Sequence, residues 1–172
     1  GIGVAVVASM LVVFARMSTP HTAVLGHVDG TTSYRNVARF PEVEIDEGIR
    51  IIRIDAAVSF VNASKTKRLV WGHAQALTES PRALVLDASG INDLDATGAE
   101  MLAELIPDIE ALDVAFHIAG VKGPVRDVMH RAGLWEEFDD RIHASTYDAV
   151  LAIRGRPALR RQLLRRMGVD ER

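Results

Sequence analysis

Residues 83–102, ALVLDASGINDLDATGAEML, indicate the fold most clearly. The first five residues of this stretch form an apolar run that ends in an aspartate, which predicts a buried strand over 83–87. Apolar residues then recur at helical spacing from Met101 to Leu112, which predicts a helix after the loop. Strand, loop and helix in this order begin a βαβ unit, so the stretch indicates a parallel sheet with helices packed on it.

The same alternation continues on both sides of this stretch. The segment GIRIIRIDAAVSFV (48–61) has isoleucines dense enough for a strand buried on both faces, and Asn62 is placed to cap the helix that follows. Gly123-Pro124 begins a later helix and Gly133 ends it. The other predicted elements are strands at 23–28, 114–121 and 141–144, and helices at 63–77 and 146–153. We therefore expect an α/β or α+β fold with a mostly parallel sheet.

Two features conflict with this regular pattern. Pro107 stands inside the helix predicted after the quoted loop, where it removes one backbone hydrogen bond, so we expect it to kink or split that helix. Residues 29–48 have no sustained period, and a structureless segment of about twenty residues is unusual in a compact domain. We expect this segment to be a functional or flexible loop.

Composition argues against several classes of function. The 172 residues suit one domain, and a net charge of −3 argues against nucleic acid as the main partner. The chain has no cysteine, so disulfides, thiol nucleophiles and thiolate metal sites are excluded. No two of the six histidines stand at the i, i+4 spacing of a helical metal site, and we expect no bound metal.

The first sixteen residues are typical of the end of a membrane helix. Residues 1–15 carry no charged side chain. As a helix they would span roughly 22 Å, which is less than the roughly 30 Å hydrocarbon core of a bilayer. Arg16 follows, and the positive-inside preference then places the rest of the chain in the cytoplasm. We expect residues 1–16 to be the last part of a longer transmembrane helix; a buried first helix or strand is the alternative.

The other end of the chain is basic. Within residues 154–172, apolar side chains at helical spacing are flanked by arginines, which suits an amphipathic helix on an anionic lipid surface. A frayed, solvated tail is the alternative. The arginines concerned are Arg160, Arg161, Arg165 and Arg166.

Four segments together resemble a known family. They are LGHVDGTTSYRNVARFPE (25–42), GIRIIRIDAAVSFVNA (48–63), LVLDASGINDLDATGAEML (84–102) and HIAGVKGPVRDVMHRAGL (117–134). In this order they look like the STAS domain (sulfate transporter and anti-sigma factor antagonist) at the C-terminus of SulP-type sulfate permeases. The resemblance covers residues 21 to about 153, and the first and last segments are more similar to the transporter branch than to the free-standing antagonists.

The resemblance implies a STAS-like fold over residues 17–153, with about four helices packed mainly on one face of the sheet. It implies no catalytic activity, but a regulatory or interaction role beside a secondary transporter of sulfate or a related inorganic anion, on the cytoplasmic side of the cell membrane. The expected partners are the membrane domain of the same transporter, a second protomer and a cytosolic regulatory protein. Weak binding of a guanine or adenine nucleotide is a further expectation, although the sequence has no GxxxxGK[ST] motif.

The loop within the quoted stretch is the predicted contact surface for a partner or nucleotide. Its candidate residues are Asp87, Ser89, Asn92, Asp93, Asp95, Thr97 and Gly98. Clustered carboxylates also suit Mg²⁺. An aspartyl phosphate, as in response regulators, is a weaker hypothesis because residues 23–30 offer only Asp29 as a further acid.

The start of the helix at residues 95–98 offers two alternatives. In the anti-sigma factor antagonists that the loop resembles, the serine after the aspartate accepts phosphate, and here that position is Ala96. Thr97 is the adjacent candidate for phosphorylation. Thr97 with Glu100 also fits a capping box, whereas Asp95 is a competing N-cap, so we expect one of the two to cap the helix.

Two rival functions remain at the level of sequence. The first is a free-standing phospho-switch protein like the anti-sigma factor antagonists, which Ala96 disfavours. The second is an α/β enzyme that uses Asp87, Asp93 and Asp95, which is disfavoured because no obvious nucleophile or base accompanies them.

Overall fold

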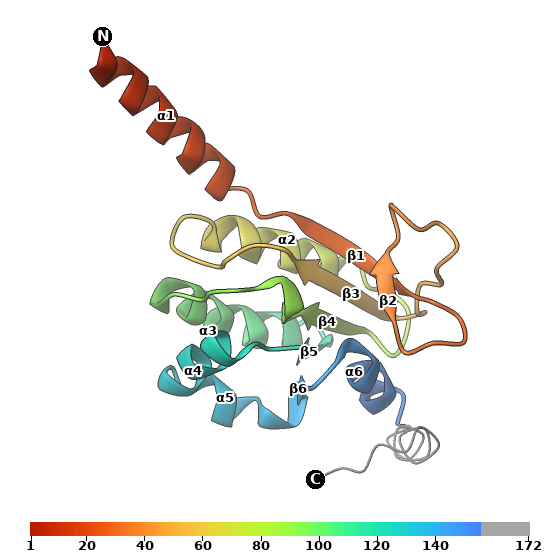
Figure 1. Ribbon diagram of the computed structural model, residues 1–172. Coiled ribbons are helices and arrows are strands. Elements are labelled where there is room, and N and C mark those ends of the chain that lie inside the picture. Colours follow the sequence, from red (N-terminus) through yellow and green to blue (C-terminus); the bar gives the residue numbers. More distant parts are fainter. Residues whose placement is uncertain (156–172) are drawn as a thin grey trace.

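The molecule is built on a six-stranded sheet in the order β2-β1-β3-β4-β5-β6 (Figure 1). The computed structural model describes residues 1–155. Strands β3 to β6 are parallel, and β1 is antiparallel to both β2 and β3, so the expected mixed, mostly parallel sheet is confirmed. The elements are α1 (Ile2–Met17), β1 (Thr22–His27), β2 (Tyr34–Asn36), β3 (Ile49–Ile54), α2 (Ala63–Gln75), β4 (Ala83–Asp87), the 3₁₀ turn η1 (Ala88–Gly90), α3 (Ala96–Glu110), β5 (Ala115–Ala119), α4 (Gly123–Arg131), α5 (Leu134–Glu137), the 3₁₀ turn η2 (Asp139–Arg141), β6 (Ile142–His143) and α6 (Thr146–Ile153).

Strands β3 and β4 form the centre of this sheet. All five residues of β4 are buried, and the four isoleucines of β3 are buried while Arg50 and Arg53 are partly exposed. Branched side chains pack well on a pleated sheet that is covered on both faces. The apolar runs of β3 and β4 are rich in such side chains, so the two strands pair at the centre of the sheet. Register places Ile51 opposite Val85 and Ile52 opposite Leu86.

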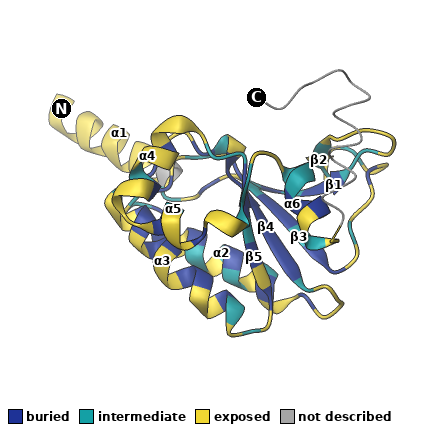
Figure 2. Ribbon diagram, turned by 90° about the horizontal axis from the view of Figure 1, so that it is seen from below, coloured by how far each residue is buried: buried dark blue, intermediate teal, exposed yellow. Residues whose placement is uncertain are grey.

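Helices cover both faces of the sheet (Figure 2). Helices α2 to α5 contribute to the larger apolar cluster, where Leu84, Leu86 and Phe116 meet Leu105 of α3. Helix α6 covers the opposite face over a smaller cluster that includes Val85. Within residues 1–155 there are six α-helices rather than about four, because α6 and the projecting α1 add to the four on the main face.

Three local predictions need correction. Residues 29–48 are not structureless, because β2 lies within them and pairs with the second half of β1. Pro107 does not split its helix: α3 runs through it to Glu110, and the Ala111 N–H still donates to the Pro107 carbonyl. Both Pro107 and Ala103, whose carbonyl loses its usual donor, are exposed to solvent, so the loss of this bond costs little.

The third correction concerns Asn62, which occupies the N-cap position of α2 without a side-chain bond to the first turn. Its Oδ1 accepts from the Ser59 N–H at 3.0 Å, and its Nδ2 donates to the Ala57 carbonyl at 2.9 Å. The buried amide therefore fixes the loop before α2.

Helix α1 projects away from the rest of the molecule (Figure 1). Between Ile2 and Phe14 its large apolar side chains are 52% to 86% exposed, so the alternative of a buried first element is not what the structure shows. Among residues 1–155 no helix is both long and apolar enough to cross a membrane. The predicted amphipathic segment with Arg160, Arg161, Arg165 and Arg166 lies outside the described residues.

The central position of β4 predicts a large loss of stability on truncation there. Leu86→Ala removes a side chain that is 1% exposed and leaves a cavity in the larger cluster, so the free energy of unfolding should fall by about 2–5 kcal/mol. Urea unfolding followed by circular dichroism measures this. Ile45→Ala, at a side chain that is 51% exposed, is the control and should stay within about 0.5 kcal/mol; equal losses in the two variants would contradict the central role of β4.

Candidate functional site

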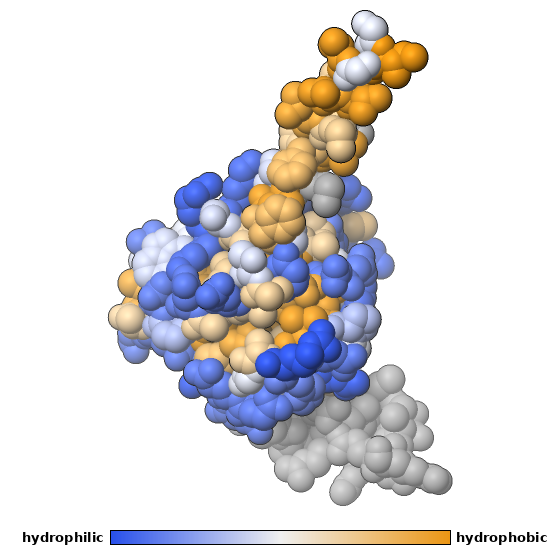
Figure 3. Space-filling view, turned by 90° about the vertical axis from the view of Figure 1, so that its left-hand side faces the viewer, coloured by the Kyte–Doolittle hydropathy of each residue, from blue (hydrophilic) through white to orange (hydrophobic). Residues whose placement is uncertain are grey.

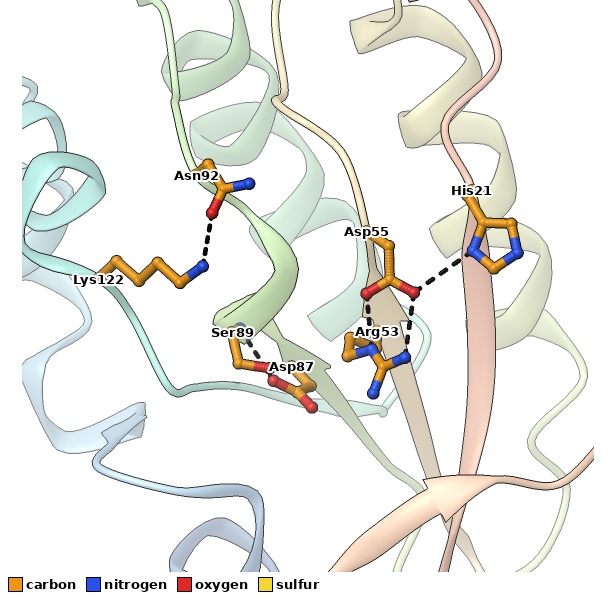
Figure 4. Close-up of polar contacts among 7 residues, drawn as sticks. All are labelled: His21, Arg53, Asp55, Asp87, Ser89, Asn92 and Lys122. Carbon is orange, nitrogen blue, oxygen red and sulfur yellow. Dashed lines mark hydrogen bonds and ion pairs between the residues drawn. The ribbon is translucent and has the colours of Figure 1, made fainter. Parts of the chain in front are cut away.

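Polar side chains gather where the parallel strands end, as Figure 4 shows. Because β3, β4 and β5 are parallel neighbours, their carboxyl ends meet at one edge of the sheet. Arg53 near the end of β3 donates from Nε and Nη2 to the two oxygens of Asp55 at 2.7 and 3.1 Å, and His21 Nδ1 lies 3.3 Å from the same carboxylate. The hydrogen bond from Arg53 lowers the pKa of Asp55, so this carboxylate is ionised at neutral pH.

Asp87 ends β4 and shapes the turn that follows. Its side chain is buried, with the residue 7% exposed, and Oδ1 accepts from the Ser89 N–H at 2.9 Å. This bond closes the short turn η1, and Lys122 after β5 donates to Asn92 Oδ1 at 2.5 Å, which ties the next part of the loop to β5. Asp87, Ser89 and Asn92 therefore all take part in the internal structure of the loop.

Asp95 joins two segments that are far apart in the sequence. Its Oδ1 accepts from the Gly98 N–H at 2.8 Å, which caps α3, and its Oδ2 accepts from the Phe60 N–H at 2.9 Å. The backbone of Val58 bonds to Asp93 and Asp95 in the same region. The loop before α2 and the loop before α3 are thus held together at the edge of the sheet.

The cap assignment corrects the alternative based on Thr97. Asp95 is the N-cap, and Thr97 is the second residue of the helix, so Thr97 and Glu100 do not form a capping box. Both side chains are exposed. The Thr97 hydroxyl is accessible, and its phosphorylation stays a prediction.

Gly98 permits a close contact that no other residue allows. A Cβ on Gly98 would lie 2.6 Å from the Val58 carbonyl oxygen and 2.7 Å from Leu94 Cδ1. Real side chains do not approach backbone so closely, so glycine lets the first turn of α3 pack directly under the loop of Val58. Gly98 is therefore a packing residue.

The aspartates of the loop do not converge on one point. Asp87, Asp93 and Asp95 each bond a different backbone N–H, and among residues 1–155 no three His, Asp or Glu side chains are grouped as metal ligands. The same bonds use the N–H groups of Ser89 and Gly98, which an anionic ligand would otherwise bind. Each of these carboxylates therefore takes part in the internal hydrogen bonding of the loop.

A groove between α3 and α4 adjoins this loop and was not predicted from the sequence. It has a volume of about 690 Å³ and is lined mainly by small or apolar side chains. Its lining residues are Leu94, Asp95, Ala96, Ala99, Glu100, Ala103, Val128, Arg131 and Ala132. The sequence shows alanines of α3 at i, i+3 and i+7, which places them on one face of that helix. It does not show which helix lies opposite this face, so the groove could not be predicted.

Apolar surface also gathers on the side of the molecule from which α1 projects, with polar residues around it (Figure 3). Phe60, whose N–H is bound by Asp95, is 67% exposed. An exposed apolar patch with a polar rim is typical of an interaction surface.

A comparison with protein families matches residues 40–149 to the STAS domain. The chain belongs to the STAS domain family. The matched range extends from the segment before β3 into α6 and includes the loops that follow β3, β4 and β5, the capped start of α3 and the groove. The resemblance seen in the sequence is thereby confirmed.

This STAS domain is similar to several sulfate transporters. It is 31% identical over 159 residues to high affinity sulfate transporter 2 of Stylosanthes hamata, an alignment that covers 87% of this chain and 24% of the transporter. It is 27% identical over 157 residues to a probable sulfate transporter of Mycobacterium tuberculosis, covering 91% and 28%. The chain thus spans about a quarter of the length of these relatives.

Solved structures show how widely the fold is shared. The STAS domain superimposes on the murine Solute Carrier 26 family member A9 anion transporter with a TM-score of 0.80 at 23% identity, over 90% of this chain and 25% of that one. It superimposes on an anti-sigma factor antagonist from Mycobacterium paratuberculosis with a TM-score of 0.58 at 20% identity, over 80% and 96%. The same fold therefore occurs in a transporter and in a free-standing protein, so the fold alone does not separate the two functions.

A pair of histidines on the α6 face of the sheet is a second polar feature of the STAS domain. His117 Nδ1 of β5 lies 3.0 Å from His143 Nε2 of β6, so one ring donates to the other. Burial, followed by the nearby His143, lowers the pKa of His117 to about 4, and burial lowers the pKa of His143. The neutral pair helps to hold the short strand β6 beside β5.

The cap predicts different costs for two neighbouring substitutions. Asp95→Ala loses both the Gly98 and the Phe60 bonds and should lower the free energy of unfolding by about 1–2 kcal/mol. Thr97→Ala removes no cap and should change it by less than about 0.5 kcal/mol. Chemical denaturation of both variants measures the difference; a Thr97→Ala cost as large as that of Asp95→Ala would show the assignment to be wrong.

The histidine pair predicts that stability falls in mild acid. The unfolded chain takes up a proton near the ordinary pKa of 6.5, whereas folded His117 does so only near 4, so this stabilisation is present above 6.5 and is lost as the pH falls toward 4. Melting temperatures measured between these limits should therefore drop more steeply for the wild type than for His117→Gln. Parallel curves for the two proteins would contradict this prediction.

Proposed function

We infer that this STAS domain is the cytoplasmic regulatory and interaction domain of a membrane transporter for sulfate or a related inorganic anion. The observation that carries the inference is the exposed apolar helix α1, joined to a STAS domain whose relatives are sulfate transporters about four times its length. The domain has no catalytic activity of its own in this proposal, and transport belongs to the membrane part.

Helix α1 is the cytoplasmic end of the last membrane helix in this proposal. Its 16 residues span about 24 Å, which is shorter than the roughly 30 Å of a hydrocarbon core. Apolar side chains that water would otherwise solvate on every side are expected in lipid. The first charged residue is Arg16, near the end of the helix, which agrees with a cytoplasmic exit.

The groove between α3 and α4 is the proposed contact surface. It combines apolar alanines with Asp95 and Glu100 on one wall and Arg131 on the other, so it suits a partner segment that is apolar with a charged rim. The partner proposed is the membrane domain of the same transporter, because α1 fixes the domain beside it. A second protomer and a cytosolic regulatory protein are the alternative partners.

Two other interpretations receive less support. A guanine or adenine nucleotide at the loop would meet carboxylates and N–H groups that are already bonded, so only weak affinity is expected there. A phospho-switch like that of the anti-sigma factor antagonists would have to use Thr97 in place of Ala96. Phosphorylation of this domain at Thr97 by a kinase would favour that alternative.

A carboxylate in the groove tests the contact. Ala103→Glu places an unpaired charge on an exposed position of the groove, so sulfate uptake by the complete transporter should fall several-fold while the unfolding of the domain stays nearly unchanged. Ala152→Glu, at an exposed position of α6, is the matched control and should retain uptake. Transporter abundance in the membrane is measured for both, and equal uptake by the two variants would contradict the contact.

A further inference from the structure

A basic pocket lies near the C-terminal end of α1, away from the groove. It has a volume of about 200 Å³, and we call it the foot pocket. Its lining contains three arginines and one carboxylate, so it is a site of net positive charge in a protein whose net charge is −3. The lining residues are His21, Tyr34, Arg35, Asn36, Arg39, Phe40, Arg53 and Asp55.

The single carboxylate of the foot pocket is already bonded. Asp55 accepts two hydrogen bonds from Arg53, at 2.7 and 3.1 Å, and its Oδ2 contacts His21 at 3.3 Å (Figure 4). These bonds hold the Arg53 guanidinium in place, and its Nη1 takes no part in them. Asp55 therefore orients one arginine without neutralising the other two.

Arg35 and Arg39 supply the excess charge. Within residues 1–155 neither of them forms an ion pair, and both are exposed. The Asn36 side chain accepts from the Ala38 N–H at 2.9 Å and the Asn36 carbonyl accepts from Arg39 and Phe40, so a tight turn returns Arg39 to the pocket. The Arg35 guanidinium lies 4.8 Å from the centre of the Phe40 ring, which supports its plane and leaves its N–H edge for a ligand.

The foot pocket is close to the end of α1. His21 is four residues beyond Met17, and four extended residues span at most about 14 Å. The intervening link is attached to the domain, because Lys65 Nζ of α2 donates to the hydroxyls of Ser18 and Thr19 at 3.4 and 3.1 Å. A membrane surface that α1 leaves would therefore lie within one or two Debye lengths of the pocket, which is about 8–10 Å each at ordinary salt.

We propose that the foot pocket binds the headgroup phosphate of an anionic phospholipid in the leaflet from which α1 emerges. The proposal rests on the membrane placement of α1 given above. Guanidinium groups offer pairs of N–H donors that match phosphate oxygens, and three such groups around one small pocket exceed what the single Asp55 can neutralise. The bound lipid would fix the orientation of the STAS domain at the membrane.

The test is vesicle binding of the complete 172-residue chain. Vesicles of phosphatidylcholine alone are compared with vesicles that also contain phosphatidylglycerol, for the wild type, Arg35→Gln/Arg39→Gln and a control, Arg82→Gln/Arg126→Gln, which removes the same charge outside the pocket. Wild type and control should prefer the anionic vesicles. The pocket variant should lose about 30-fold of that preference, as expected for two arginines near an anionic surface.

Each other outcome has a definite meaning. A pocket variant that prefers anionic vesicles as strongly as the control overturns the proposal, and so does a wild type without any preference. If inorganic phosphate shifts the amide resonances of Arg35 and Arg39 while the wild type shows no preference for anionic vesicles, the ligand is a free oxyanion and the lipid assignment is wrong. Binding to vesicles of phosphatidylcholine alone depends on α1. If the wild type does not bind these vesicles, the proposed function is contradicted and the pocket is not.

Discussion

The burial of β4 on both faces determines how the neighbouring strands and helices are arranged. Its five residues have parallel neighbours on either side, and parallel pairing requires crossover connections, so α2 and α3 must pack on the sheet between successive strands. The same geometry brings the carboxyl ends of β3, β4 and β5 together. The polar edge with Asp55, Asp87 and Lys122 is therefore a consequence of the core.

The acidic side chains of the loop at this edge stabilise the fold. Asp87 closes the turn η1, and Asp95 caps α3 while it also bonds the Phe60 N–H of the loop before α2. A carboxylate that accepts several backbone N–H bonds is well satisfied without a cation. The groove between α3 and α4 lies beside this edge.

Two of the surfaces with proposed functional roles lie near α1. The foot pocket lies close to the end of α1, and Figure 3 shows apolar surface on the side of the molecule from which α1 projects. Helix α6 and the histidine pair occupy the other face of the sheet. A STAS domain attached by α1 would thus be fixed at the membrane by covalent linkage and charge, and would meet its transporter through an apolar contact.

Most of the elements and the family could be predicted from the sequence, whereas β2 and α5 were missed. The periods of residues 48–61 and 83–112 predicted the strands and helices because burial on two faces or on one helical stripe leaves a local pattern, and the four quoted segments identified the STAS domain. The tertiary structure decided which groups meet. Asp95 rather than Thr97 caps α3, and Phe60, 35 positions away, donates a second hydrogen bond to the same carboxylate. The edge strand β2 pairs with the open side of β1. The groove and the foot pocket depend on such distant pairs, for which one sequence carries no local signal.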